Sequence, residues 1–172
     1  MRSTRRLILA ALPLAIVLAA CSGSPSAPTG PAFGLPATGT LGGPTASPML
    51  VLTNQARAAA GLPALTHNSK LDAAAALLCH EIAQTGIIDH TQPGTAHPTP
   101  GDRVTAEGYV WHYVGENLNF GGDSTMAVAF QNFMNSPPHR ANILEPLVTN
   151  YGDAMVTVGN YYCWVQDFAA PL

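Results

Sequence analysis

The chain has 172 residues, of which 47% are hydrophobic and only 10% are charged, and its formal net charge at pH 7 is −3. It contains 7 Lys and Arg against 10 Asp and Glu, and Arg2, Arg5 and Arg6 precede the first apolar run. Without these three, 7 − 3 = 4 basic residues face 10 acidic ones, a net charge near −6. So few cations exclude a basic surface for nucleic acid.

The N-terminal arginines are followed by the apolar run LILAALPLAIVLAA. This run is too short for a stable membrane span, and its basic flank is typical of a secretory signal. It closes on LAAC, which resembles a bacterial lipobox. We predict a lipoprotein signal peptide over residues 1–20 and cleavage before Cys21, whose lipid anchors the protein to the membrane or cell envelope outside the cytoplasm. The alternative is an ordinary signal peptide with a chance cysteine.

Residues 21–46 follow the signal and, after Cys21, are nearly all Ser, Pro, Gly, Ala and Thr. Such a segment cannot bury enough apolar surface to offset the entropy of ordering, so we predict a flexible tether. Residues 47–172 have the usual size of one domain.

The domain sequence opens with two helical patterns. Ser47 followed by Pro48 is a helix-start signal, and the helix is expected to run until Gly61 and Pro63. A second helix is predicted from Asn68 or Ser69 to the stop at Gly86, with a buried face at Leu71, Ala75, Leu78 and Ile82.

The later segments alternate between loop, helix and strand patterns. Residues 89–102, DHTQPGTAHPTPGD, predict a long loop, and a third helix is expected to open at Asp123 or Ser124. The runs AMVTV and YYCWVQDF predict two strands joined by a turn at Gly159 and Asn160. Helices followed by a hairpin predict an α+β fold in which helices cover a small antiparallel sheet.

Two cysteines remain in the domain once Cys21 carries lipid. Outside the cytoplasm we expect Cys79 and Cys163 to pair and to tie an early helix to the last strand. Two buried free thiols are the alternative.

The stretch NSPPHRANIL, residues 135–144, fixes one histidine in place. Ser136 is expected to cap the following turn, and Pro137 suits a first helical position. With the backbone held, His139 has few directions in which to point. We prefer the cap over a nucleophilic role for Ser136, and the sequence shows no conventional nucleophile.

Three residues are candidates for one site. His90, Glu116 and His139 are each expected beside a helix end or a turn, where loop side chains converge on a cleft. Asn117 and Asn142 follow two of them and are expected to satisfy backbone groups.

Five segments resemble, in order, those of the bacterial CAP domain, the superfamily of cysteine-rich secretory proteins, antigen 5 and pathogenesis-related proteins, also called SCP. They are LTNQARAAAGLPAL, IIDHTQPG, DRVTAEGYVWHYVGENLNFGG, FMNSPPHRANILEPLVTNYGDAM and YYCWVQDFA. The resemblance implies a three-layer α-β-α sandwich with a central cleft.

On the cleft floor the resemblance places three residues, His90, Glu116 and His139. Glu116 matches the glutamate of the Gly-Glu-Asn motif, and His139 matches the histidine after Ser-Pro-x. His90 and His139 could bind a divalent metal such as zinc. The chain departs from the family at Phe133 and Pro138, where tryptophan and glycine are usual, and a second family glutamate has no counterpart.

Three functions follow from these residues. The first is a binding module for a small apolar, lipid-like or sterol-like ligand or a cell-wall component, with no catalytic residue. The second is a structural domain whose polar cluster braces the fold. The third is a metal-dependent hydrolase of peptide, ester or cell-wall bonds, with His90 and His139 as ligands and Glu116 as base. We expect binding rather than catalysis.

Overall fold

The computed structural model describes residues 47–122 and 125–172. The predicted signal peptide, the lipidated Cys21 and the tether lie outside these residues. Within the described ranges, every helix is too short or too polar to cross a membrane.

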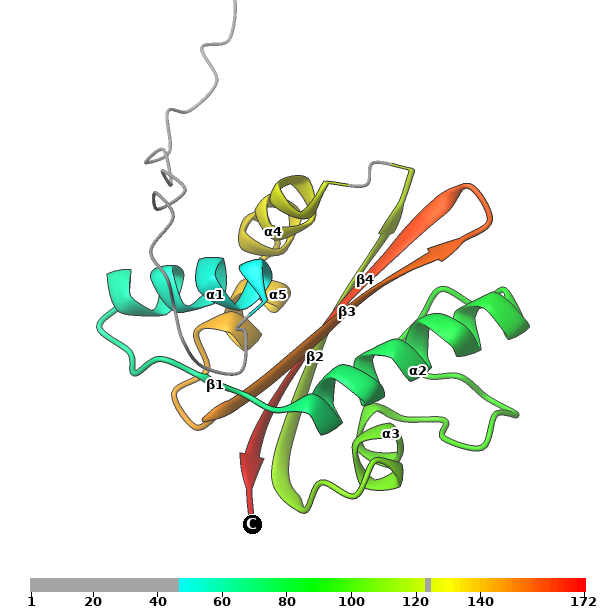
Figure 1. Ribbon diagram of the computed structural model, residues 1–172, viewed down its shortest axis with the longest axis horizontal. Helices are drawn as coiled ribbons and strands as arrows, with labels where there is room; N and C mark the ends of the chain where they lie inside the picture. Colours follow the sequence, from blue (N-terminus) through cyan, green and yellow to red (C-terminus); the bar gives the residue numbers. More distant parts are fainter. Residues whose placement is uncertain (1–46, 123–124) are drawn as a thin grey trace, which may run out of the picture. The chain divides into compact units, whose positions relative to one another are not determined.

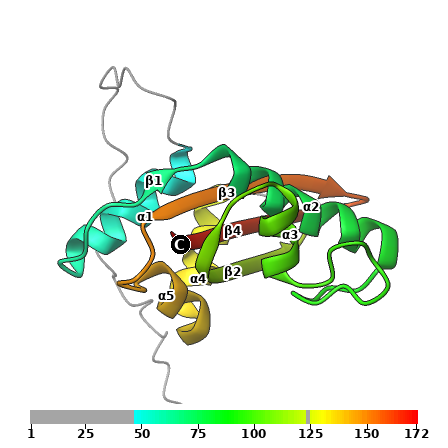
Figure 2. The ribbon, with the colours of Figure 1, turned by 90° about the horizontal axis from the view of Figure 1, so that it is seen from below.

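The described chain folds into three layers around one sheet. Helices α1, α4 and α5 lie on one side of the sheet, and α2 and α3 lie on the other (Figure 1; Figure 2 shows β3, β4 and β2 next to one another). In chain order the elements are α1 (Pro48–Ala59), β1 (Thr66–His67), α2 (Ser69–Thr85), α3 (Pro100–Ala106), β2 (Trp111–Gly121), α4 (Met126–Asn135), α5 (Pro137–Ile143), β3 (Asn150–Val158) and β4 (Tyr161–Pro171). The predicted α+β, three-layer α-β-α sandwich is confirmed.

The sheet has the strand order β1-β3-β4-β2. Strands β3 and β4 form the predicted hairpin, and Gly159 in its turn has a φ of 61°, a left-handed conformation that glycine adopts without a steric penalty. Strand β2 pairs antiparallel with β4 along its length and forms one edge of the sheet. The short β1 adds a parallel pair with β3, which the sequence pattern did not predict.

The predicted helix boundaries at the start of the domain are confirmed. The Ser47 side chain accepts a hydrogen bond from the Leu50 amide, and Asn68 caps α2 in the same way. Gly86 ends α2 with a φ of 71°. These local signals place the last turn of α2 just before the loop that carries His90.

Two helices differ from the sequence prediction. Residues 100–102, expected in the long loop, open α3, because Pro100 fits the first helical turn and Thr99 and Asp102 form a reciprocal capping box. Helix α4 begins at Met126 with Thr125 as its cap. The predicted openers, residues 123 and 124, lie outside the described residues.

Each face of the sheet has its own apolar core. Strand β4 alternates, so that Trp164 and Phe168 pack with α1, α4 and α5, whereas Cys163 and Val165 pack against α2. The predicted disulfide is present: Cys79 of α2 bonds to Cys163 of β4 with an S–S distance of 2.07 Å. Residues 165, 167 and 169 therefore share the face that α2 and α3 cover.

Candidate functional site

Glu116 lies in the middle of the edge strand β2, not beside a helix end or turn as predicted. Glycine, glutamate and asparagine are uncommon in strands, so Gly115, Glu116 and Asn117 obscured the strand in the sequence. Full pairing with β4, in which Glu116 lies opposite Asp167, overrides this local preference. The strand directs Glu116 to the α2 and α3 side, where its side chain is 2% exposed.

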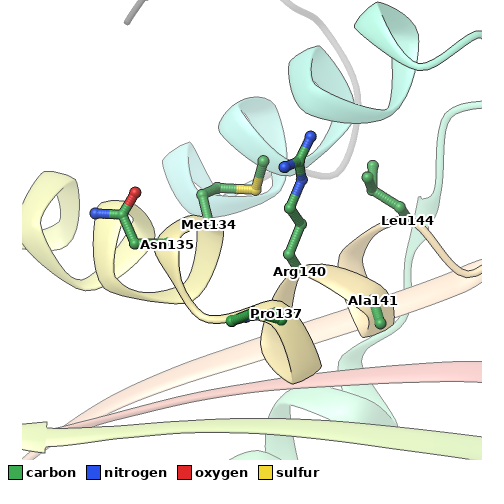
Figure 3. A pocket seen from close by; sticks show the side chains of 6 residues that line it. All are labelled: Met134, Asn135, Pro137, Arg140, Ala141 and Leu144. Carbon is green, nitrogen blue, oxygen red and sulfur yellow. The ribbon is translucent and has the colours of Figure 1, made fainter. Parts of the chain in front are cut away.

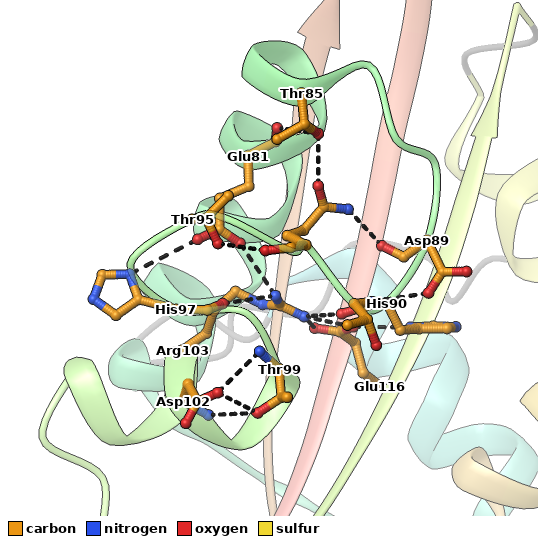
Figure 4. A network of polar contacts seen from close by, with 12 residues as sticks. Glu81, Thr85, Asp89, His90, Thr95, His97, Thr99, Asp102, Arg103 and Glu116 are labelled. Atoms are coloured by element: carbon orange, nitrogen blue, oxygen red, sulfur yellow. Dashed lines mark hydrogen bonds and ion pairs between the residues drawn. The ribbon is translucent and has the colours of Figure 1, made fainter.

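The Glu116 carboxylate is the centre of a buried polar network (Figure 4). Its Oε1 atom lies 2.8 Å from His90 Nδ1. The Arg103 guanidinium donates from Nη2 to both carboxylate oxygens, at 3.0 Å each. Both oxygens of Glu116 are thus engaged by protein donors.

Arg103 comes from α3 and is fully buried. Its Nη1 atom donates to Glu81 Oε2 at 3.1 Å, so one guanidinium joins carboxylates from α2 and β2. It also donates to the backbone carbonyls of His90, at 2.8 Å, and His97, at 3.2 Å. Arg103 therefore fixes both ends of the long loop after α2 against the site.

His90 is the partly open member of the network, with 42% of its side chain exposed. The hydrogen bond to Glu116 is the main cause that raises the pKa of His90 above 6.5, burial opposes it, and the charges of Glu116 and Asp89 assist it. Because Nδ1 faces Glu116, the second ring nitrogen, Nε2, is available to a ligand.

His139 reaches the site from α5, on the opposite face of the sheet. Its ring packs edge-on against Phe133, the residue that stands where the family usually has tryptophan, with centroids 5.4 Å apart. Burial lowers the pKa of His139 below 6.5, and the charge of His90 lowers it further. The structure therefore joins His90 directly to Glu116, whereas the ring contact of His139 is with Phe133.

Side-chain amides connect α5 to strand β2. Asn142 donates to the Glu116 carbonyl at 3.1 Å and to Asn117 Oδ1 at 2.9 Å. Asn117 in turn donates to the His139 carbonyl at 3.0 Å. The prediction that these two asparagines satisfy backbone groups is confirmed for the Glu116 and His139 carbonyls, but Asn117 lies in β2 and Asn142 in α5 and not in turns as predicted. The two amides hold the His139 backbone beside the edge strand.

The stretch NSPPHRANIL contains the last residue of α4 and all of α5. Ser136 occupies the cap position of α5, but its side chain makes no capping hydrogen bond, so that prediction is wrong. The physical reason is that Pro137 and Pro138 have no amide hydrogens, which leaves fewer donors to cap. The prolines start the helix, and His139 follows in its first turn.

The outward side of α5 borders a shallow depression of about 330 Å³ (Figure 3). It is lined by Met134, Asn135, Pro137, Arg140, Ala141 and Leu144. Arg140 projects at its rim and, within the described chain, makes neither an ion pair nor a side-chain hydrogen bond. This surface is separate from the His90 network.

A metal site needs several ligating side chains that lie close together. In residues 47–122 and 125–172, no group of three or more His, Cys, Asp or Glu side chains is arranged to hold one. Glu116 faces the His90 Nδ1 atom and Arg103. His90 and His139 do not by themselves complete a ligand set.

Sequence reasoning missed two central residues, Arg103 and Asp167. Arg103 is one of the few basic residues in an acidic domain, which was a usable signal. Asp167 is four residues after Cys163, and residues an even number apart in a strand point to the same face of the sheet. Because the bond from Cys163 to α2 was predicted, the sequence already placed the Asp167 carboxyl on the face that α2 covers.

The three-layer sandwich is the fold of a CAP-type domain. The chain belongs to the Cysteine-rich secretory protein family, whose sequence profile matches residues 50–168.

Individual relatives agree with this assignment. "Uncharacterized protein YkwD" of Bacillus subtilis (strain 168) is 31% identical over 117 residues, which cover 68% of this chain and 44% of that protein. The chain therefore spans less than half the length of this curated relative.

Solved structures share the fold. An extracellular protein containing a SCP domain from Bacillus anthracis superposes with a TM-score of 0.64 at 24% identity, covering 71% of this chain and 39% of that one. An outer surface protein from Borrelia burgdorferi gives a TM-score of 0.64 at 19% identity, covering 72% and 90%. A cysteine-rich secretory protein from Staphylococcus aureus gives 0.55 at 20% identity, covering 70% and 37%.

Proposed function

We propose that the protein is a lipid-anchored, extracytoplasmic binding module. In this proposal a small apolar or lipid-like ligand, or a cell-envelope component, binds in a cleft at the β2 edge to which His90, Glu116 and His139 contribute. The signal sequence and the membership in a secretory family support the location. The polar network supports the preference for binding.

The observation that carries the proposal is that the Glu116 carboxylate is buried and fully hydrogen-bonded. A general base must reach a water molecule or a substrate proton. Glu116 is buried, and its two oxygens are held by His90 and Arg103. Such a carboxylate orients the half-exposed His90 ring, which suits a fixed polar contact with a ligand.

The test is to purify the protein from its native envelope, extract it with organic solvent and identify the extract by mass spectrometry. We expect an envelope lipid or related amphiphile in the wild type and a reduced amount in His90→Ala. The matched control is His112→Ala, which removes an exposed histidine from the start of β2 and should leave the extract unchanged. Wild-type protein that emerges empty and binds no envelope lipid or glycan would contradict the proposal.

A metal-dependent hydrolase is an alternative, with His90 and His139 as two of its metal ligands. The favouring observation is that His90 gives Nδ1 to a carboxylate and keeps Nε2 free, as histidines that bind metals commonly do. Metal analysis of the native protein, combined with an activity screen of Glu116→Gln, decides this question. Absence of both bound metal and measurable activity would exclude the hydrolase.

The anchor is tested separately. Replacing Cys21 with alanine should release the protein from the membrane fraction into the medium, because lipid can no longer be attached. Release measured by immunoblot is the expected result. Unchanged membrane partition of the variant would show that another feature holds the protein there.

A further inference from the structure

Asp167 lies next to the site and has no part in the function proposed above. It is the direct partner of Glu116 in the β2–β4 ladder, and its side chain points to the same α2 and α3 face. Opposite residues of an antiparallel pair have Cβ atoms about 5 Å apart. Two acidic side chains thus lie side by side under His90.

The two carboxyl groups differ in the hydrogen bonds that they receive. Glu116 receives hydrogen bonds from Arg103 and contacts His90 Nδ1. Asp167 is fully buried, and neither of its oxygens receives a hydrogen bond from the described chain. A buried carboxylate without a donor is strongly unfavourable, whereas a neutral carboxylic acid needs only one acceptor.

The Glu116 carboxylate can serve as that acceptor, because Glu116 lies directly opposite Asp167 in the β2–β4 ladder and both side chains are on the same face of the sheet. We propose that Asp167 is a neutral carboxylic acid that donates its proton to Glu116, so that the two carboxyl groups carry one negative charge between them. Asp167 is then a positioning residue: it holds Glu116, and Glu116 holds His90. The inference concerns the charge state of the network and does not depend on which ligand the cleft binds.

The charges around Asp167 agree with this assignment. Glu116 faces it from β2, Arg103 from α3 and Asp72 from α2, and the guanidinium is already shared with Glu81 of α2. His90 and His97 add charge only when they are protonated. Burial first, and the Glu116 charge second, raise the pKa of Asp167 well above its ordinary value, while Arg103 opposes this.

The direct test is carbon-13 NMR of the aspartate and glutamate side-chain carboxyl carbons in the folded domain. Between about pH 5 and 7, where an unperturbed aspartate is ionised, we expect the Asp167 carbon at the chemical shift of a protonated acid and the Glu116 carbon at that of a carboxylate. An Asp167 carbon at the carboxylate position throughout this range would overturn the proposal.

A pair of variants gives an independent readout through the pKa of His90. Asp167→Asn keeps an uncharged donor, so the pKa of His90 should change by less than about 0.3 units; loss of an ionised group beside the carboxylate that contacts His90 would lower this pKa by about one unit or more. Asp89→Asn is the control, because the exposed Asp89 carries a charge that raises the pKa of His90. A fall in Asp167→Asn as large as in Asp89→Asn, or larger, would show that Asp167 is ionised.

Discussion

At the scale of single residues, Arg103 is the group on which the network depends. It is fully buried and pairs with Glu81 and Glu116, so its removal leaves two carboxylates without their shared cation. Breaking a buried pair in this way costs roughly 3–5 kcal/mol. Arg103→Gln should therefore lower the free energy of unfolding by that amount in a denaturant titration.

Arg140→Gln is the matched control for this substitution. Arg140 is exposed on α5 and lacks an ion-pair partner within the described chain, so the change is expected to stay within about 0.5 kcal/mol. Equal effects of the two substitutions would show that the ion pairs of Arg103 contribute nothing specific.

The pKa values of the two site histidines are shifted in opposite directions from 6.5. The pKa of His90 is raised above 6.5, so its stabilising contribution is complete below that value and is lost as the pH rises through the folded-state pKa. The pKa of His139 is lowered, so its contribution is present above 6.5 and is lost as the pH falls through the folded-state pKa. Proton NMR of the ring signals should show His139 deprotonating first as the pH rises, and the reverse order would contradict the described environments.

The residues of the site were only partly predictable from the sequence. His90, Glu116 and His139 were identifiable because each lies in a motif of the family. Arg103 and Asp167 were missed although composition and strand alternation offered signals, since their importance depends on burial and on the β2–β4 register, which places Asp167 opposite Glu116 across about 50 residues of sequence.

At the scale of elements, the packing of α2 on β3 depends on a glycine. A Cβ atom added to Gly152 would lie 2.3 Å from the Asp72 amide nitrogen and from the Leu71 carbonyl carbon. Backbone atoms cannot yield as a flexible side chain can, so Gly152→Ala should destabilise the domain by about 1–3 kcal/mol or more. The strand glycine Gly121, whose added Cβ would meet nothing within 4 Å, is the control, and Gly121→Ala should stay within about 1 kcal/mol. Thermal unfolding of both variants tests the difference, and similar melting temperatures would contradict it.

The same two layers are joined covalently by the disulfide. Cys79 and Cys163 are 84 residues apart, and a cross-link of this span restricts the unfolded chain by about 4 kcal/mol on the chain-entropy model. The double variant Cys79→Ala, Cys163→Ala should lose stability of that order in denaturant unfolding. Unchanged stability would mean that the bond does not constrain the unfolded state, whereas Cys21→Ala should leave the unfolding of the domain unaffected.

Elements with local signals were the predictable ones. Capping residues marked α1 and α2, and the turn at Gly159 and Asn160 marked the β3–β4 hairpin. Helix α3 was obscured by the proline-rich loop before it. The two-residue β1 exists only through its pairing with β3, which no local pattern specifies.

At the scale of the whole molecule, the fold puts the site at an open edge of the sheet. Strand β2 has a neighbour on one side only, and α5 supplies His139 from the face opposite to Arg103. The three-layer arrangement thus brings side chains from both faces to one edge. The order of helices and strands predicted an α+β sandwich, and the family resemblance implied its three layers, but the meeting of the two faces is a property of the assembled fold.

The most direct test of the binding proposal is histidine-ring NMR during titration with a lipid extract of the native envelope. The proposal predicts saturable shifts of the His90 and His139 ring signals together, with the signals of His112, at the start of β2, unchanged. Shifts of equal size at all histidines, or none at His90 and His139, would contradict a ligand site at this edge of the sheet.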